Sequence, residues 1–320
     1  MSRQRIARFI GISTAAGAAL LLTGLAAAQG RWETKVVTIA PGEWAGPRLP
    51  DGQPDIQGHW SNTIANHDNF TDPQGGIPGD EADAGGGGAA AIGTVKANKE
   101  RAPSRVSDPS DGQVPFQPWA RAKQQDFLEH LNNPTRPEYV EPFARCAPGG
   151  PTKSFMWHGY EVRQYPGYVL FLFGSGTRII HLDGKPHLPE NIKLWNADSR
   201  GHWEGNTLVV DVTNNNSKAR LARTGEFASD QVHIEERYTF ANDGERYVYN
   251  AVYTDPTVFT RPFTVTIPAK RVTADSPQDG WHNETFFAND PSGRRSIESY
   301  EHICVESNDG HGDVAAAPAP

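Results

Sequence analysis

The chain has 320 residues, 37% hydrophobic and 10% aromatic, which is enough for one sizeable domain or two small ones and excludes disorder throughout. It holds 32 glycines and 25 prolines but only two methionines, so a turn-rich β architecture is favoured over long helices. The formal net charge of −8 speaks against nucleic acid as a partner.

Residues 1–28 are typical of a secretory signal peptide. Three arginines precede an apolar run from Phe9 to Ala27, and three alanines at 26–28 provide a small-residue cleavage site. A membrane anchor is the alternative, but glycine and serine interrupt the run and no basic cluster follows it. We therefore expect a periplasmic or secreted protein with no stable membrane span after cleavage.

Residues 29–140 are predicted to form a long irregular arm, because proline and glycine interrupt its few apolar runs. Two elements are expected within it. One is a strand at Gly58-His59-Trp60. The other is a packing helix at 118–131, which a proline begins and Asn132-Asn133-Pro134 ends.

Residues 141–308 are expected to form an antiparallel β-barrel of about eight strands, followed by a disordered tail at 309–320. Short apolar runs alternate with period two, and turn residues such as Asp183-Gly184 close them. This pattern favours a barrel or sandwich over a doubly wound α/β sheet. No G-x-G-x-x-G or P-loop sequence is present, and no cofactor is expected. The expected strands are 161–164, 168–173, 178–182, 208–213, 232–240, 247–253, 263–267 and 299–305.

The chain has two cysteines, Cys146 and Cys304, near the ends of the β-rich segment. An exported protein meets an oxidising compartment, so the pair predicts one disulfide bridge. A nucleophilic cysteine is the less favoured alternative, because neither residue begins a helix or belongs to a Cys-x-x-Cys sequence.

The strand at 232–240 carries the central functional prediction. Alternation puts Glu236 on the same face as Val232, Ile234 and Tyr238, so an acid interrupts an apolar row. If that row faces a cavity, Glu236 is suited to proton transfer near neutral pH. In the alternative, Glu236 is buried and satisfied by an arginine such as Arg178 or Arg261. The opposite face carries His233 and Arg237, which predict a solvated charge ladder unless the barrel interior is that face.

Two further clusters contain histidines and acids. The segment 178–187 leads from a strand into an Asp-Gly turn and presents Asp183 and His187, either at the mouth of a sheet or as ordinary surface residues. In the segment 195–211, His202 and Glu204 flank Trp203 and could act with an arginine on a carboxylate; alternatively, Trp203 closes one barrel end. Their spacings match no metal-binding pattern, so no metal site is predicted.

Tyrosines gather on neighbouring strands. Tyr247, Tyr249 and Tyr253 share one face of their strand, and Tyr238 lies in the strand before. Such a stripe gives a cavity hydrogen-bond donors beside flat apolar walls, which would suit an aromatic substrate. Plain sheet core is the alternative.

Two resemblances follow from these segments. Gly58-His59-Trp60 is similar to the G-x-W opening of lipocalin-type barrels. The chain also resembles a large family of secreted bacterial proteins of largely unassigned function, from which it departs at Asn206, usually acidic, and Phe263, usually tryptophan. The resemblance implies relatives among cofactor-independent decarboxylases of lignin-derived aromatic acids. The matching pieces are PDIQGHW (54–60), LDGKPH (182–187), GHWEGNTLVVDV (201–212), HIEERY (233–238), TDPTVFTRPF (254–263) and YEHICVES (300–307).

The sequence therefore predicts an exported lyase or decarboxylase that uses acid–base chemistry on an aromatic or apolar carboxylate. The alternatives are a periplasmic binding protein for a hydrophobic small molecule, and a carbohydrate-directed hydrolase or lyase that would use Glu204 with Glu236. A small molecule is the expected partner, and the oligomeric state stays open. The candidate catalytic residues are Glu236, His187, Arg178, His202 and Tyr249. The candidate substrate-binding residues are Tyr247, Tyr253, Tyr238, Trp203, Asp183 and His233.

Overall fold

A computed structural model describes residues 38–62, 70–71, 104–130, 134–140, 142–156, 159–173, 176–222, 224–273, 287–289 and 295–297. Strands dominate this part of the chain. The strands are β1 (Gly58–Ser61), β2 (Val106–Asp108), β3 (Tyr160–Tyr165), β4 (Tyr168–Phe173), β5 (Gly176–His181), β6 (Asp198–Glu204), β7 (Thr207–Thr213), β8 (His233–Phe240), β9 (Arg246–Thr254), β10 (Phe263–Val272), β11 (Phe287–Asn289) and β12 (Arg295–Ile297). The helices are α4 (Pro118–Glu129), α5 (Gly150–Met156) and the 3₁₀ turns η1 (Pro137–Tyr139) and η2 (Pro142–Arg145).

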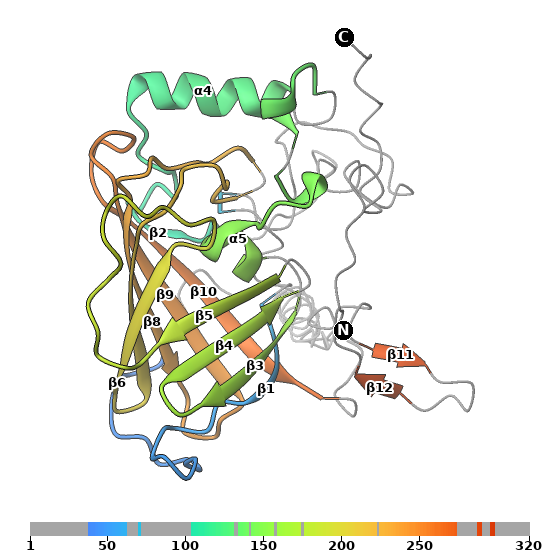
Figure 1. The fold of residues 1–320 in the computed structure, drawn as a ribbon, viewed down its shortest axis with the longest axis vertical. Helices are drawn as coiled ribbons and strands as arrows, with labels where there is room; N and C mark the ends of the chain where they lie inside the picture. The colour runs from blue at the N-terminus through green and yellow to red at the C-terminus, as the bar shows by residue number, and fades with distance from the viewer. Residues whose placement is uncertain are drawn as a thin grey trace, which may run out of the picture. The chain divides into compact units, whose positions relative to one another are not determined.

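Nine strands close into a barrel in the order β1-β3-β4-β5-β6-β7-β8-β9-β10, and β10 pairs back with β1 (Figure 1). The prediction of about eight strands is one short. The arm supplies β1 to the barrel. Strand β6 was not among the expected strands, and the expected strand at 299–305 lies outside the described residues. A separate two-stranded sheet consists of β11 and β12.

One strand pair departs from the predicted antiparallel pattern, because β5 and β6 run parallel. A closed ring whose neighbours are all antiparallel needs an even number of strands, so nine strands require a parallel pair. Parallel neighbours need a long crossover, which residues 182–197 provide. Only two residue pairs, Ile180 with Ser199 and His181 with Arg200, define this seam.

The barrel closes along one side of β10. Lys270–Val272 pair with β1, whereas Thr264 and Val265 pair with β2, which lies outside the ring. Pro268 falls between the two stretches, and this position is tolerated because proline has no N–H to donate to a neighbour. Short edge segments therefore share the free side of β10.

Residues of the arm contribute to the core. Trp44, Ile56, Trp60 and Phe70 are all buried with the inward residues of the barrel strands. Trp60 contacts Phe240 and Tyr247 at ring-centroid distances of 5.6 and 5.0 Å. These buried residues of the predicted arm therefore pack with the β structure.

Helices lie at one end of the barrel (Figure 1). In α5, the side chain of Phe155 is fully buried and contacts Tyr160 and Tyr249 of the barrel. In α4, which ends two residues before the predicted end, Ala120 and Gln124 form the buried side. None of the described helices is long and apolar enough to cross a membrane.

Some predictions fall outside the described residues. These are the signal peptide at 1–28, the glycine run of the arm, and the tail at 309–320. Cys146 is described but Cys304 is not, so the predicted bridge between them stays a prediction.

Candidate functional site

The predicted tyrosine stripe lies inside the barrel and forms a cluster of touching rings. Tyr238, Tyr247 and Tyr249 are fully buried, with centroids 4.9 Å apart for Tyr238 and Tyr249. Phe155 of α5 packs on Tyr249 at 4.4 Å, and the hydroxyls of Tyr160 and Tyr247 hydrogen-bond each other. Burial raises the pKa of Tyr238, Tyr247 and Tyr249 well above the usual value of a tyrosine. They remain neutral donors, and their rings occupy space that a substrate would need.

Glu236 also points inward and is 0% exposed, where it forms a bidentate ion pair with Arg178. Arg178 Nη1 donates to Glu236 Oε1 at 3.0 Å and Nη2 donates to Oε2 at 2.7 Å. The hydroxyl of Tyr249 adds a hydrogen bond to Oε1 at 2.9 Å. Burial alone would lower the pKa of Arg178, but the Glu236 carboxylate raises it above its usual value. This geometry corresponds to the alternative in which an arginine satisfies Glu236.

The same arginine bridges the parallel seam. Arg178 lies on β5, and its Nε and Nη2 donate to Ser199 Oγ of β6 at 3.1 and 2.9 Å. Its guanidinium thus connects β5 to β6 and, through Glu236, to β8. The guanidinium of Arg178, one of the candidate catalytic residues, is therefore already paired with a carboxylate of the protein.

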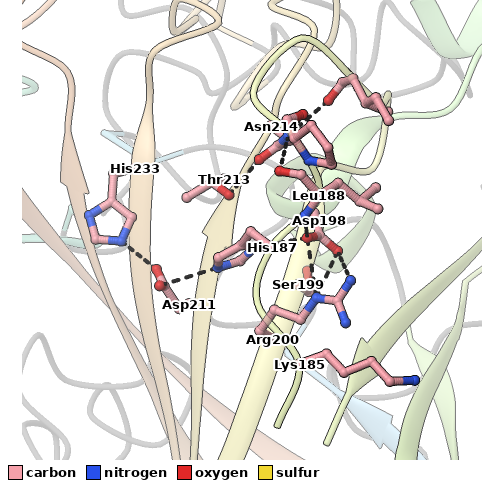
Figure 2. Close-up of polar contacts among 12 residues, drawn as sticks. Lys185, His187, Leu188, Asp198, Ser199, Arg200, Asp211, Thr213, Asn214 and His233 are labelled. Carbon is pink, nitrogen blue, oxygen red and sulfur yellow. Dashed lines mark hydrogen bonds and ion pairs between the residues drawn. The ribbon is translucent and has the colours of Figure 1, made fainter. Parts of the chain in front are cut away.

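A second cluster lies on the outer face of β6, β7 and β8, and it joins two predicted histidines (Figure 2). His187, in the crossover after β5, has Nδ1 2.9 Å from Asp198 Oδ2 and Nε2 3.2 Å from Asp211 Oδ2. His233 Nε2 hydrogen-bonds the other oxygen of Asp211. The result is a continuous series from Asp198 through His187 and Asp211 to His233.

Asp198 is the buried end of this series. Its carboxylate accepts hydrogen bonds from the Leu188 N–H at 2.9 Å and from Arg200 Nε at 3.1 Å. Burial alone would raise the pKa of Asp198, but the bonds from Leu188, Arg200 and His187 hold it below its usual value. The carboxylate therefore stays ionised and fixes the orientation of the His187 ring.

The hydrogen-bond pattern gives the two histidines different roles. Both ring nitrogens of His187 face carboxylate oxygens, and only a doubly protonated ring donates to both. His233 Nε2 hydrogen-bonds Asp211, and its Nδ1 has no hydrogen bond with any other described residue. With the proton on Nε2, Nδ1 presents a lone pair.

His233 borders a surface depression of about 460 Å³, within the size range of small-molecule sites. Loop residues after His187 form one wall, and the ends of β7 and β8 form the other. The lining residues are Glu190, Asn191, Lys193, Thr213, Asn214, Asp230, Gln231, Val232 and His233.

Two non-glycine residues at positive φ flank the cluster. Ala197, with φ of 54°, precedes Asp198, and Asn214, with φ of 62°, follows Thr213. Asp198 and Thr213 are themselves paired between β6 and β7. Such conformations each cost about 1–3 kcal/mol and persist where the surroundings impose them, frequently at functional sites.

Asn214 also shapes the depression. Its side-chain amide donates to the carbonyl oxygens of Leu188, Pro189 and Ile192 at 3.2, 2.9 and 2.9 Å. Its own carbonyl accepts the Leu194 N–H at 2.8 Å. One residue thereby holds the loop wall against the end of β7.

The other predicted residues lie outside the depression. His202 contacts Glu204, and Glu204 forms an ion pair with Arg237 of β8. Of the predicted ladder residues, Arg237 therefore pairs with Glu204, whereas His233 pairs with Asp211. Trp203 packs against the core. Glu204 and Glu236 lie on opposite sides of the barrel wall and cannot flank one glycosidic bond.

Asp183 and Tyr253 have other partners. Asp183 pairs with Lys185 at 3.0 Å, and the Tyr253 hydroxyl donates to Thr152 Oγ1 at 3.2 Å. Neither lines the depression.

Sequence reasoning did not nominate Asp198, Asp211 or Lys193. Asp211 was accessible to it, because alternation along β7 places Asp211 outward, as it places His233 outward on β8. The positions of Asp198 and Lys193 depend on the path of the crossover, for which the sequence contains no periodic pattern.

No group of three or more histidine, cysteine, aspartate or glutamate residues in the described part of the chain is arranged to hold a metal ion.

Comparison of the chain with family models, curated proteins and solved structures found no match.

Proposed function

We propose that the protein is an exported, cofactor-independent enzyme of the lyase type that acts on a small organic carboxylate in the depression beside His233. One observation carries the proposal. A histidine whose Nε2 is held by Asp211 lines a concavity of small-molecule size, with its Nδ1 available to a ligand.

In this proposal His233 is the catalytic base and Asp211 is a positioning residue. Asp211 keeps the proton of His233 on Nε2, so that Nδ1 removes a proton from the carbon next to the substrate carboxylate. The electron pair of that C–H bond forms a C=C bond as a β-substituent leaves, and the protonated His233 returns its proton to the leaving group. His187, between two carboxylates, holds Asp211 in place.

The finer assignment from the resemblance, a decarboxylase of aromatic acids, receives less support from the lining, whose described residues include no phenylalanine, tyrosine or tryptophan. A barrel that binds a hydrophobic molecule in its interior would need the space that the tyrosine and phenylalanine rings take up. We further propose that the barrel is lipocalin-like, on the support of the Gly-x-Trp strand β1 that closes it.

Turnover by variants tests the function. Purified protein is incubated with a panel of small organic acids, and products are measured by mass spectrometry. We expect His233→Asn to lower turnover by about 10²- to 10⁴-fold, the usual contribution of a positioned base. His202→Asn is the matched control, because His202 is also an exposed histidine beside an acid on the same face but lies outside the depression. Full turnover by His233→Asn, or no conversion of any acid by the wild type, contradicts the proposal.

A further inference from the structure

We propose that the depression beside His233 binds a hydroxylated organic acid of the sugar-acid class, and that Lys193 Nζ binds its carboxylate. The inference rests on the proposed function, which places the site beside His233. It concerns the ligand that binds there and not the reaction that follows.

Among the described residues that line the depression, Lys193 is the only lysine or arginine. Its Nζ donates to the Asp230 carbonyl oxygen at 2.7 Å and lies 3.9 Å from the Asp230 carboxylate, and its side chain is 27% exposed. An ammonium group has three hydrogens to donate, so these two contacts fix its position and leave a donor for a ligand. A carboxylate is the ligand group that gains most from such a fixed, partly desolvated cation.

The rest of the lining is suited to hydroxyl groups. Every lining residue except Val232 is polar or charged. Asn191 and Gln231 carry amides that both donate and accept, and Glu190 accepts only. Small-molecule sites are usually lined mainly by apolar and aromatic side chains, so this composition points away from a ring-shaped hydrophobe.

Each simpler ligand leaves part of the lining unused. A neutral sugar would satisfy the amides and carboxylates, but its hydroxyl groups would form a weaker hydrogen bond with Lys193 than a carboxylate does. An aromatic acid would satisfy Lys193 but would cover the amides and Glu190 without hydrogen bonds, which carries the desolvation penalty of each group. A hydroxylated carboxylate satisfies both sets.

Such a ligand also fits the proposed chemistry. If the leaving substituent is a β-hydroxyl, His233 takes the α-proton, the electron pair forms C=C, and the hydroxyl leaves with the returned proton as water. The reaction is a dehydration in which nothing is oxidised or reduced, so it needs no further reactant.

Binding of galacturonate, galactose and benzoate to the full chain, measured by calorimetry, tests the inference. We expect galacturonate to bind at least about tenfold more tightly than the other two, because a hydrogen bond to a charged group is worth about 1.5–3 kcal/mol. Lys193→Met should remove this preference. Lys185→Met is the matched control, since Lys185 lies in the same crossover, is 75% exposed and pairs with Asp183 outside the depression.

Equal binding of galactose, tighter binding of benzoate, or unchanged binding by Lys193→Met overturns the inference. The proposed function fails separately. His233→Asn should still bind galacturonate, because His233 acts on the reaction and Lys193 on binding. If His233→Asn keeps full turnover while galacturonate binding depends on Lys193, only the proposed function is wrong. If His233→Asn loses turnover of another acid and galacturonate does not bind to the protein, only the inference is wrong.

Discussion

Glu226 is a carboxyl group buried near α5, and it makes the stability of the fold depend on pH. Thr224 Oγ1 lies within 2.6 and 2.8 Å of its two oxygens. Burial raises the pKa of Glu226 above its usual value. The Glu226 carboxyl therefore binds its proton more tightly in the folded state than in the unfolded state. The stability of the fold falls as the pH rises from the pKa of Glu226 in the unfolded state towards its pKa in the folded state, and the loss is complete above the folded-state pKa.

We expect Glu226→Gln to raise the free energy of unfolding by about 1 kcal/mol at pH 8, a usual size for one substitution. The gain should shrink towards pH 4, where the carboxyl is protonated in both states. Urea unfolding at the two pH values measures it, with the exposed Glu43→Gln as control. A loss of stability at pH 8 would show that the buried charge is compensated by its surroundings.

The sequence largely predicted which residues share one side of a strand, but it did not predict their hydrogen-bond and ion-pair partners. Alternation along one strand predicted that Glu236 lies on the opposite face from His233 and Arg237, and the structure shows that the face of Glu236 is the inner one. Arg178 was named as a partner for Glu236 only as one alternative. The actual pairing connects β5 with β8 across the interior, which depends on how the barrel closes.

The crossover between β5 and β6 forms the wall of the depression, and Asn214 holds it in place. Replacing Asn214 removes its hydrogen bonds to the carbonyl oxygens of Leu188, Pro189 and Ile192. We expect Asn214→Gly to lower stability by about 1–3 kcal/mol, because each lost hydrogen bond contributes about 0.5–1.5 kcal/mol. Asn214→Ala should lose about 1–2 kcal/mol more, because a side chain with Cβ disfavours positive φ.

Hydrogen exchange separates this local effect from global unfolding. The amides of Ile192 and Leu194 should exchange faster in Asn214→Gly, while those of the distant strand β4 stay protected to nearly the wild-type degree. Unchanged exchange at Ile192 and Leu194 would mean that other contacts hold the crossover.

Strands with regular apolar alternation were the predictable elements, and β6 was not. Its inward positions before Trp203 are Ser199 and Gly201, so no apolar row marks it. Packing explains the glycine, since a Cβ at Gly201 would lie 2.8 Å from Ile180 Cγ2. Close approach at the parallel seam thus removes the pattern on which prediction relies.

Closure of the ring depends on β1, because this short strand joins β3 to β10. Trp60 is fully buried there, and Arg271 of β10 stacks on its ring at 4.6 Å. We expect Trp60→Ala to lower the free energy of unfolding by about 3–5 kcal/mol, as large-to-small core substitutions do. Trp119→Ala is the control, since Trp119 is 50% exposed and should change stability by less than about 1 kcal/mol. Comparable losses in urea unfolding would show that β1 does not anchor the ring.

Composition and the spacing of turns predicted the class of fold, but they did not predict that β1 closes the barrel by pairing with β10. Residues 59–61 pair with residues 270–272, some two hundred positions later, and no local pattern specifies such a partner. The same limit applies to the site, where side chains from segments around 187, 211 and 233 contact one another although they are far apart in sequence.

A ring of hydrogen-bonded strands has one further consequence, for behaviour in crowded solution. Open sheets invite a foreign strand to dock along their unpaired rim and so begin to aggregate. In the described barrel β1 pairs on both sides, and β2 covers part of what β10 leaves bare. A neighbouring molecule therefore meets mostly side chains along the described barrel, because few backbone N–H and C=O groups of its strands are left unpaired for a further strand.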